Sequence, residues 1–212
     1  MAYLLNNPVA ILELALQHLR MTVWAVGIAA VIALPLGTWV SDRQWLRVPL
    51  LGLLSTLYTI PSLALIVLLL PLFGLNANSV IAAMVLYNQA ILVRNVTVAL
   101  AGIDPAILEA ARGMGMTPWQ RWWQVRLPLI LPVFLAGVRL ATVVSIAIGT
   151  LGALFAAGGL GELLFEGVTQ DRPDKIWAGA IAVAGLALLL NSALRRFESW
   201  ATPHSARTAR QT

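Results

Sequence analysis

The sequence predicts an all-α polytopic membrane protein built on five transmembrane helices. Apolar residues make up 59% and charged residues 11% of the 212 residues, and the mean hydropathy is +0.83. Soluble domains carry about 25% charged residues, and a spanning helix needs about 20 mostly apolar residues. Segments of that length lie at 21–40, 48–73, 79–101, 129–157 and 176–194. We therefore expect a single transmembrane domain over residues 21–194.

The segment before the first span, residues 1–20, is predicted to lie outside this domain on the external membrane surface. Within it, Glu13, Gln17 and Arg20 recur at i, i+4 and i+7 and give residues 8–20 an amphipathic pattern. An alternative interpretation is a signal peptide, because Arg20 directly precedes an apolar run.

Basic residues are divided unevenly between the predicted loops. They fall after the first span (Arg43, Arg47), between the third and fourth spans (Arg112, Arg121, Arg126) and in the tail 195–212 (Arg195, Arg196, Arg207, Arg210). The intervening loops are the uncharged GLNANS and the segment GGLGELLFEGVTQDRPDK, whose acids outnumber its bases. The positive-inside rule then makes the basic segments and the carboxyl terminus cytoplasmic and the amino terminus external. The net charge of +5 reflects this asymmetry and a tail near anionic lipid, not nucleic-acid binding.

The sequence offers no group for chemistry. It has no cysteine, and its two histidines, His18 and His204, lie far apart, so we expect no disulfide, no metal site and no catalytic residue. Gly158-Gly159-Leu160-Gly161 is not followed by the Gly-Lys-Ser/Thr of a phosphate loop. We expect this glycine run to turn the chain at the outer end of the fourth span.

The loop at residues 102–128 contains the half-polar stretch EAARGMGMTPWQRWWQVRLP. Asp104-Pro105 and Thr117-Pro118 each combine an N-cap residue with proline at the first helical position, which predicts helices at 105–113 and 118–125. Gly113 and Gly115 would form the bend between them. Pro128 and Pro132 are expected to disturb entry into the fourth span. The alternative is an interfacial loop anchored in the membrane by Trp119, Trp122 and Trp123.

The spacing within this loop resembles a known motif. Glu109-Ala110-Ala111, three residues, Gly115, nine residues and then Val125-Arg126-Leu127-Pro128 is similar to the EAA motif, EAA-x3-G-x9-I-x-LP, of permease subunits of binding-protein-dependent ABC importers. Valine replaces isoleucine. We call residues 102–128 the EAA loop. The resemblance covers residues 18–168, and TIPSLAL and AGVR look like the branch that imports osmoprotectants such as glycine betaine, choline and carnitine.

The resemblance implies a fold of the methionine-importer type in the bacterial cytoplasmic (inner) membrane. It implies a translocation subunit that is not an enzyme, with ATP and Mg on two separate cytoplasmic ATPase subunits. A second permease subunit, identical or different, and an extracytoplasmic binding protein would complete the importer. Glu109, Ala110, Ala111, Arg112 and Gly115 would form a coupling helix, in which Glu109 pairs either with Arg112 or with the ATPase.

Residues of the translocation path are harder to choose. The fourth span is rich in small residues, which predicts packing against protein, and it carries Arg139 with no acid in any span to pair with it. We expect Arg139 in a water-lined or subunit-interface position, with snorkelling as the alternative. Arg94 lies only seven residues from its span's end, which favours snorkelling. Tyr58, Tyr87 and Asn88 are candidates for lining the path, with structural packing as the alternative.

Three other functions stay open. The chain could import methionine or another amino acid, since that branch shares the five-span plan. It could be a non-transporting membrane scaffold whose basic loop docks a cytoplasmic protein. An intramembrane enzyme is disfavoured by the missing catalytic residues.

Overall fold

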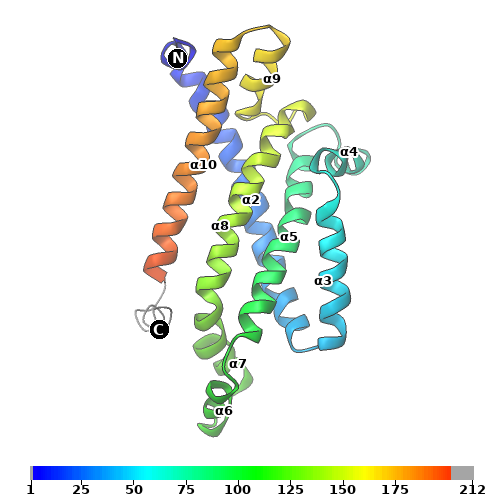
Figure 1. Ribbon diagram of the computed structural model, residues 1–212, viewed down its shortest axis with the longest axis vertical. Helices are drawn as coiled ribbons and strands as arrows, with labels where there is room; N and C mark the ends of the chain where they lie inside the picture. The colour runs from blue at the N-terminus through cyan, green and yellow to red at the C-terminus, as the bar shows by residue number, and fades with distance from the viewer. Residues whose placement is uncertain (1, 202–212) are drawn as a thin grey trace.

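The computed structural model describes residues 2–201 and is almost entirely helical there, with no strand in that part of the chain (Figure 1). The helices are α1 (Ala2–Asn6), α2 (Pro8–Ser41), α3 (Gln44–Thr59), α4 (Ser62–Phe73), α5 (Ala77–Ala101), α6 (Pro105–Gly113), α7 (Pro118–Arg121), α8 (Leu127–Gly152), α9 (Gly161–Thr169) and α10 (Pro173–Ala201). A π-helical turn, Trp122–Arg126, joins α7 to α8, and a 3-10 turn, Ala153–Phe155, follows α8. His204, Arg207 and Arg210 lie outside the described residues.

The long helices α2, α5 and α8 pack side by side and form the centre of the bundle (Figure 1). Small residues let them approach closely: a Cβ added to Gly37 on α2 would lie 2.7 Å from the Val96 side chain on α5. On α8, the residues Gly137, Ala141, Thr142, Ser145, Gly149 and Gly152 are all buried. Since lipid tails are as apolar as leucine, such close packing is what holds membrane helices together. The predicted protein-facing surface of the fourth span is confirmed.

The amino-terminal segment differs from its prediction. Residues 8–20 are the first part of the single helix α2, which has 34 residues and is therefore about 51 Å long. The segment does not lie apart from the span, because two of its side chains pack against the bundle. His18 is fully buried, with Nε2 3.1 Å from the carbonyl oxygen of Ile146, and Gln17 Oε1 accepts a hydrogen bond from the Gly159 amide at 3.0 Å.

The second predicted span, 48–73, is not one straight helix. It breaks between α3 and α4, whose axes differ by 98°. The break falls at Ile60-Pro61, where Ile60 is extended at φ −65° and ψ 128°. Proline disfavours the helical conformation in the preceding residue and has no amide hydrogen to donate. Of this pair, α3 has 16 residues, or about 24 Å, which is short of a full crossing.

The other spans agree with the prediction within a few residues, except at the carboxyl end. Four helices or continuous helical stretches, Pro8–Ser41, Ala77–Ala101, Pro118–Phe155 and Pro173–Ala201, are each long and apolar enough to cross a membrane, and the bent α3–α4 pair supplies a fifth candidate. The all-α five-span class therefore holds, with a broken second span. Helix α10 continues to Ala201, so the first part of the predicted tail 195–212 is helical.

The two ends of the bundle carry different loops (Figure 1). We call the end with the α2–α3 connection, α6, α7 and the last turns of α10 the basic end. The opposite end, with α1, α9 and the start of α10, is the acidic end. All three segments that the sequence marks as basic lie, as far as they are described, toward the basic end.

Candidate functional site

The EAA loop is a rigid projection at the basic end, held by local hydrogen bonds. Asp104 Oδ1 caps α6 by accepting from the Ala106 amide at 2.9 Å. Thr117 and Gln120 form a reciprocal capping box at the start of α7. Between the two helices Gly115 has φ +74°, a conformation that glycine adopts freely and other residues do not. The predicted helix 105–113 and the glycine bend are confirmed.

The second helix of the loop differs from its prediction, because it does not end before the fourth span. Residues Pro118–Phe155 are one continuous helical stretch of 38 residues. Its π-helical turn begins at Trp122, whose carbonyl oxygen accepts from the Leu127 amide. This wider spacing accommodates Pro128, which has no amide hydrogen, and Pro132 lies inside α8 without ending it. The prolines therefore change the width of the helix rather than interrupting it.

The five predicted coupling residues do not share one surface. Glu109, Ala110, Arg112 and Gly115 are exposed, whereas Ala111 is 1% exposed and packs within the chain. Of the two alanines, only Ala110 is therefore free to sit against another protein. Glu109 and Arg112 form no ion pair within residues 2–201, so of the two alternatives for Glu109 the pairing with Arg112 is absent from this structure.

A hollow at the basic end gathers three arginines. It has a volume of about 330 Å³ and is lined by Arg112, Arg121, Arg126 and Asp42, together with apolar side chains. Arg126 Nη1 lies 3.2 Å from Asp42 Oδ2, which ties the π-helical turn to the end of α2. This pair could not be predicted from the sequence, since its two residues lie 84 positions apart. One carboxylate against three guanidinium groups leaves the hollow positively charged.

Arg139 has an acidic partner, contrary to the sequence analysis. Its Nε lies 3.3 Å from Glu198 Oε2, and its Nη1 donates to Asn191 Oδ1 at 3.4 Å. Glu198 was missed because α10 runs beyond residue 194, where the fifth span was expected to end. Arg139 is 35% exposed and bridges α8 to α10, so the premise that it has no partner is wrong.

Of the three other candidates for the path, only Tyr58 reaches an open surface. Asn88 is fully buried, and its Nδ2 donates to Ser145 Oγ at 2.9 Å. Tyr87 is 6% exposed and donates its hydroxyl hydrogen to the carbonyl oxygen of Ile60. These two residues connect helices, as the packing alternative states. Tyr58 is 42% exposed, with its ring 5.3 Å from that of Tyr87.

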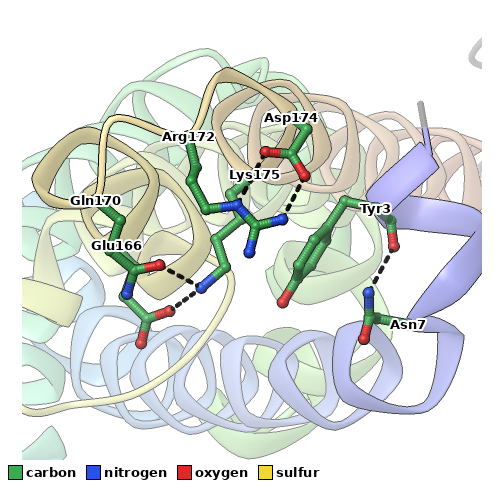
Figure 2. Close-up of polar contacts among 7 residues, drawn as sticks. All are labelled: Tyr3, Asn7, Glu166, Gln170, Arg172, Asp174 and Lys175. Carbon is green, nitrogen blue, oxygen red and sulfur yellow. Dashed lines mark hydrogen bonds and ion pairs between the residues drawn. The ribbon is translucent and has the colours of Figure 1, made fainter.

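The acidic end is closed by contacts within the chain. Figure 2 shows Lys175 Nζ donating to Glu166 Oε2 at 2.9 Å and to Gln170 Oε1 at 3.0 Å. Arg172 pairs with Asp174 beside it at 2.6 Å. The ring of Tyr3 faces both cations, with centroid distances of 5.5 Å to Arg172 and 5.6 Å to Lys175. The Tyr3 ring therefore already makes cation–π contacts with two residues of the chain itself.

The glycine run that leads into α9 makes a turn, as predicted. Gly158 and Gly159 have φ of +80° and +87°. A Cβ added to Gly161 would lie 2.0 Å from the carbonyl oxygen of Thr150. Each of these three glycines is therefore needed for its backbone shape or for its lack of a side chain.

Known proteins are similar to this chain in sequence and in architecture. The family model for "Binding-protein-dependent transport system inner membrane component" matches residues 24–203. The chain is 39% identical to the osmoprotectant import permease protein OsmW of Salmonella typhimurium over 97% of this chain and 98% of that one. It is 37% identical to the carnitine transport permease protein OpuCB of Listeria monocytogenes over 92% and 89%. A chain of the MetNI methionine ABC transporter has a similar fold, with a TM-score of 0.81 at 21% identity over 91% and 96%.

Proposed function

The chain belongs to the family of inner membrane components of binding-protein-dependent transport systems, and from this premise we propose that it is the permease of an ABC importer for osmoprotectants such as glycine betaine, choline or carnitine. The observation that carries the substrate class is the near full-length identity of 39% to a permease named for osmoprotectant import. The likeness to the methionine transporter, at 21% identity, supports the fold and not the substrate.

The assembly follows from what the chain provides and what it lacks. Helix α3 packs against α5 and α2 but has no buried residue in the structure, so the bundle leaves one side of it uncovered. We therefore include a second permease subunit, identical or different, against this face. Two ATPase subunits supply ATP and Mg, since the sequence has no phosphate loop. An extracytoplasmic binding protein delivers the substrate.

The EAA loop is the part of the chain that we assign to the ATPase subunits. It projects from the basic end (Figure 1), its helices are capped at both N-termini, and α7 runs into α8 without a flexible linker. A rigid projection can pass a movement of the ATPase to the span. This assignment makes the basic end cytoplasmic and the acidic end, with the amino terminus, external, in agreement with the positive-inside rule.

Uptake by the reconstituted importer tests the proposal. The chain is co-purified with its ATPase subunits, placed in vesicles and supplied with its binding protein. We expect radiolabelled glycine betaine, choline or carnitine to accumulate in the compartment that corresponds to the cytoplasm only when ATP is present on that side. Substrate and binding protein should also stimulate ATP hydrolysis. A complex that accumulates methionine instead, or none of these compounds, would refute the proposed substrate class.

A further inference from the structure

A second hollow lies between α3, α5 and α8, away from the EAA loop. Its volume is about 330 Å³, within the range of small-molecule sites, and its lining includes Ser55, Tyr58, Arg94, Asn95 and Leu140. The polar groups come from two helices, α3 and α5. Helix α3 supplies Ser55 and Tyr58 to its lining and has no buried residue of its own, so the hollow lies beside the face where we expect the second permease subunit.

Arg94 brings an uncompensated positive charge to this hollow. It is exposed and forms no ion pair within residues 2–201, in contrast to Arg139, which pairs with Glu198. Arg94 lies seven residues before the end of α5, about 10 Å along the helix axis. An ionisable residue within a membrane span is costly and is a functional candidate unless it is paired. Unlike Arg139, Arg94 is therefore available to an anion.

Tyr58 brings an aromatic ring whose position is fixed. It packs on the Tyr87 ring at 5.3 Å, and Tyr87 is in turn held by its hydrogen bond to Ile60 at the α3–α4 break. The exposed face of such a ring attracts quaternary ammonium groups, which cannot donate hydrogen bonds. No carboxylate lines the hollow, so an ammonium group there has only the ring as its partner.

We propose that this hollow is a substrate subsite for zwitterions that carry both a quaternary ammonium group and a carboxylate. The Arg94 guanidinium binds the carboxylate, and the Tyr58 ring faces the ammonium group. A cation without a carboxylate, such as choline, binds more weakly because Arg94 repels it and nothing offsets that repulsion. This inference rests on the proposed function and adds to it a preference for betaines over choline within the permease itself.

Equilibrium binding without the binding protein isolates this site. The permease and its ATPase subunits are purified together in lipid nanodiscs, and radiolabelled glycine betaine and choline are titrated separately. We expect saturable binding of glycine betaine, with choline weaker by about tenfold, the ratio that one charge-assisted hydrogen bond provides. Arg94→Gln should abolish that ratio, because it weakens glycine betaine and relieves the repulsion of choline. Tyr58→Leu should weaken both ligands, and Tyr58→Phe should retain both.

Controls separate this site from a general defect. Arg195→Gln removes an exposed arginine near the same end of another long helix and should leave both affinities unchanged. Because both ligands are measured on one preparation, misfolding of Arg94→Gln would lower both together. If Arg94→Gln does not assemble, Arg94→Lys keeps the charge and must retain the preference for glycine betaine.

Three outcomes would overturn the subsite. The first is unchanged glycine betaine binding in Arg94→Gln, as expected if Arg94 pairs with a lipid phosphate. The second is an equal loss of both ligands in an Arg94→Gln complex that assembles normally, and the third is a wild-type complex without saturable binding. If the same complex still imports glycine betaine when its binding protein is added, the proposed function stands and only the subsite fails. If it imports none of the three quaternary amines, the proposed function fails first.

Discussion

At the acidic end, the glycine turn 158–161 is packed against α2 and α8, whereas at the basic end the space beside Gly115 is open. A Cβ at Gly158 would lie 2.4 Å from Gln17 Oε1, and one at Gly161 would lie 2.0 Å from the Thr150 carbonyl. A Cβ at Gly115 would find no atom of the chain within 4 Å. Both turns have positive φ angles, yet only at the acidic-end turn do other atoms of the chain occupy the space beside the glycines.

The difference separates two reasons for a glycine. The acidic-end turn needs glycine so that this chain can close on itself. The turn at Gly115 needs glycine for its backbone, and the open space around it is available to another protein. The same contrast holds for charges, since Lys175 is paired twice within the acidic end while the hollow at Arg112 has an excess of arginine.

Gly161→Ala should have the largest effect on stability. The added methyl group would overlap the Thr150 carbonyl oxygen, a backbone atom that cannot rotate away. We expect a loss of about 3 kcal/mol in the free energy of unfolding, the upper part of the range for overpacked sites. The measurement is the yield of monodisperse protein and the melting temperature in detergent.

Gly185→Ala is the matched control for this change. Gly185 lies within α10, and a Cβ there would have no neighbour within 4 Å. Alanine favours a helix over glycine by about 0.5–1 kcal/mol, so this variant should melt at the wild-type temperature or above it. Equal melting temperatures for Gly161→Ala and Gly185→Ala would show that the acidic-end turn is not tightly packed.

Gly115→Val should have a smaller effect on stability and a large effect on transport. The φ of +74° costs a non-glycine residue about 1–2 kcal/mol, but no atom of the chain opposes the side chain. We expect the variant to insert and purify. ATPase co-purification and glycine betaine uptake should fall about tenfold, since a branched side chain in a packed interface costs 1–3 kcal/mol or so.

Two neighbouring variants show whether this loss is specific. Gly113→Ala has open space around the added methyl group and should retain uptake. Glu109→Ala should weaken the binding of the ATPase subunits by about 1 kcal/mol or less, as is usual for an exposed ionic contact. Normal assembly and uptake in Gly115→Val would refute the coupling assignment. If Trp122→Ala and Trp123→Ala loosen membrane attachment instead, the loop is an interfacial anchor.

Glu162→Gln should have the smallest effect and should depend on pH. Burial at the start of α9, followed by the nearby Glu166, raises the pKa of Glu162 above its ordinary value. Its protonated form is therefore favoured by folding, and the stability that it contributes is present at low pH and lost as the pH rises through the raised pKa. Glutamine mimics the protonated form, so the variant should melt slightly higher than wild type at pH 7.

Both proteins should melt alike near pH 4, where Glu162 is largely protonated. Melting curves in detergent between pH 4 and pH 8 measure this. A wild-type protein that gains stability relative to Glu162→Gln as the pH rises would contradict the sign of the pKa shift.

Features set by neighbouring residues could be read from the sequence. The caps at Asp104 and Thr117 and the turn at the glycine run each depend on a few adjacent residues, and the structure has all of them. The break at Pro61 could not be read this way, because Pro35, Pro49, Pro71 and Pro132 lie inside helices without ending them.

Pairs between residues on distant helices could not be read from the sequence either, because they depend on how the helices pack. At the α3–α4 break, the Ile60 carbonyl accepts from Tyr87, which lies on another helix. In a membrane such a free carbonyl needs a partner inside the protein, and the sequence does not show which residue provides it. Likewise Arg139 could not be assigned to Glu198 before the end of α10 was known. The sequence therefore did not show that Arg139 has an acidic partner.

The π-helical turn Trp122–Arg126 also sets the angular position of the EAA loop. Because Pro118–Phe155 is one unbroken helical rod, any twist applied at α7 is transmitted along α8 as torsion, without slack. Deleting one residue from the α-helical part of this rod would rotate the loop by about 100° around it. The loop would then present a different side to its partner while the rest of the bundle kept its shape.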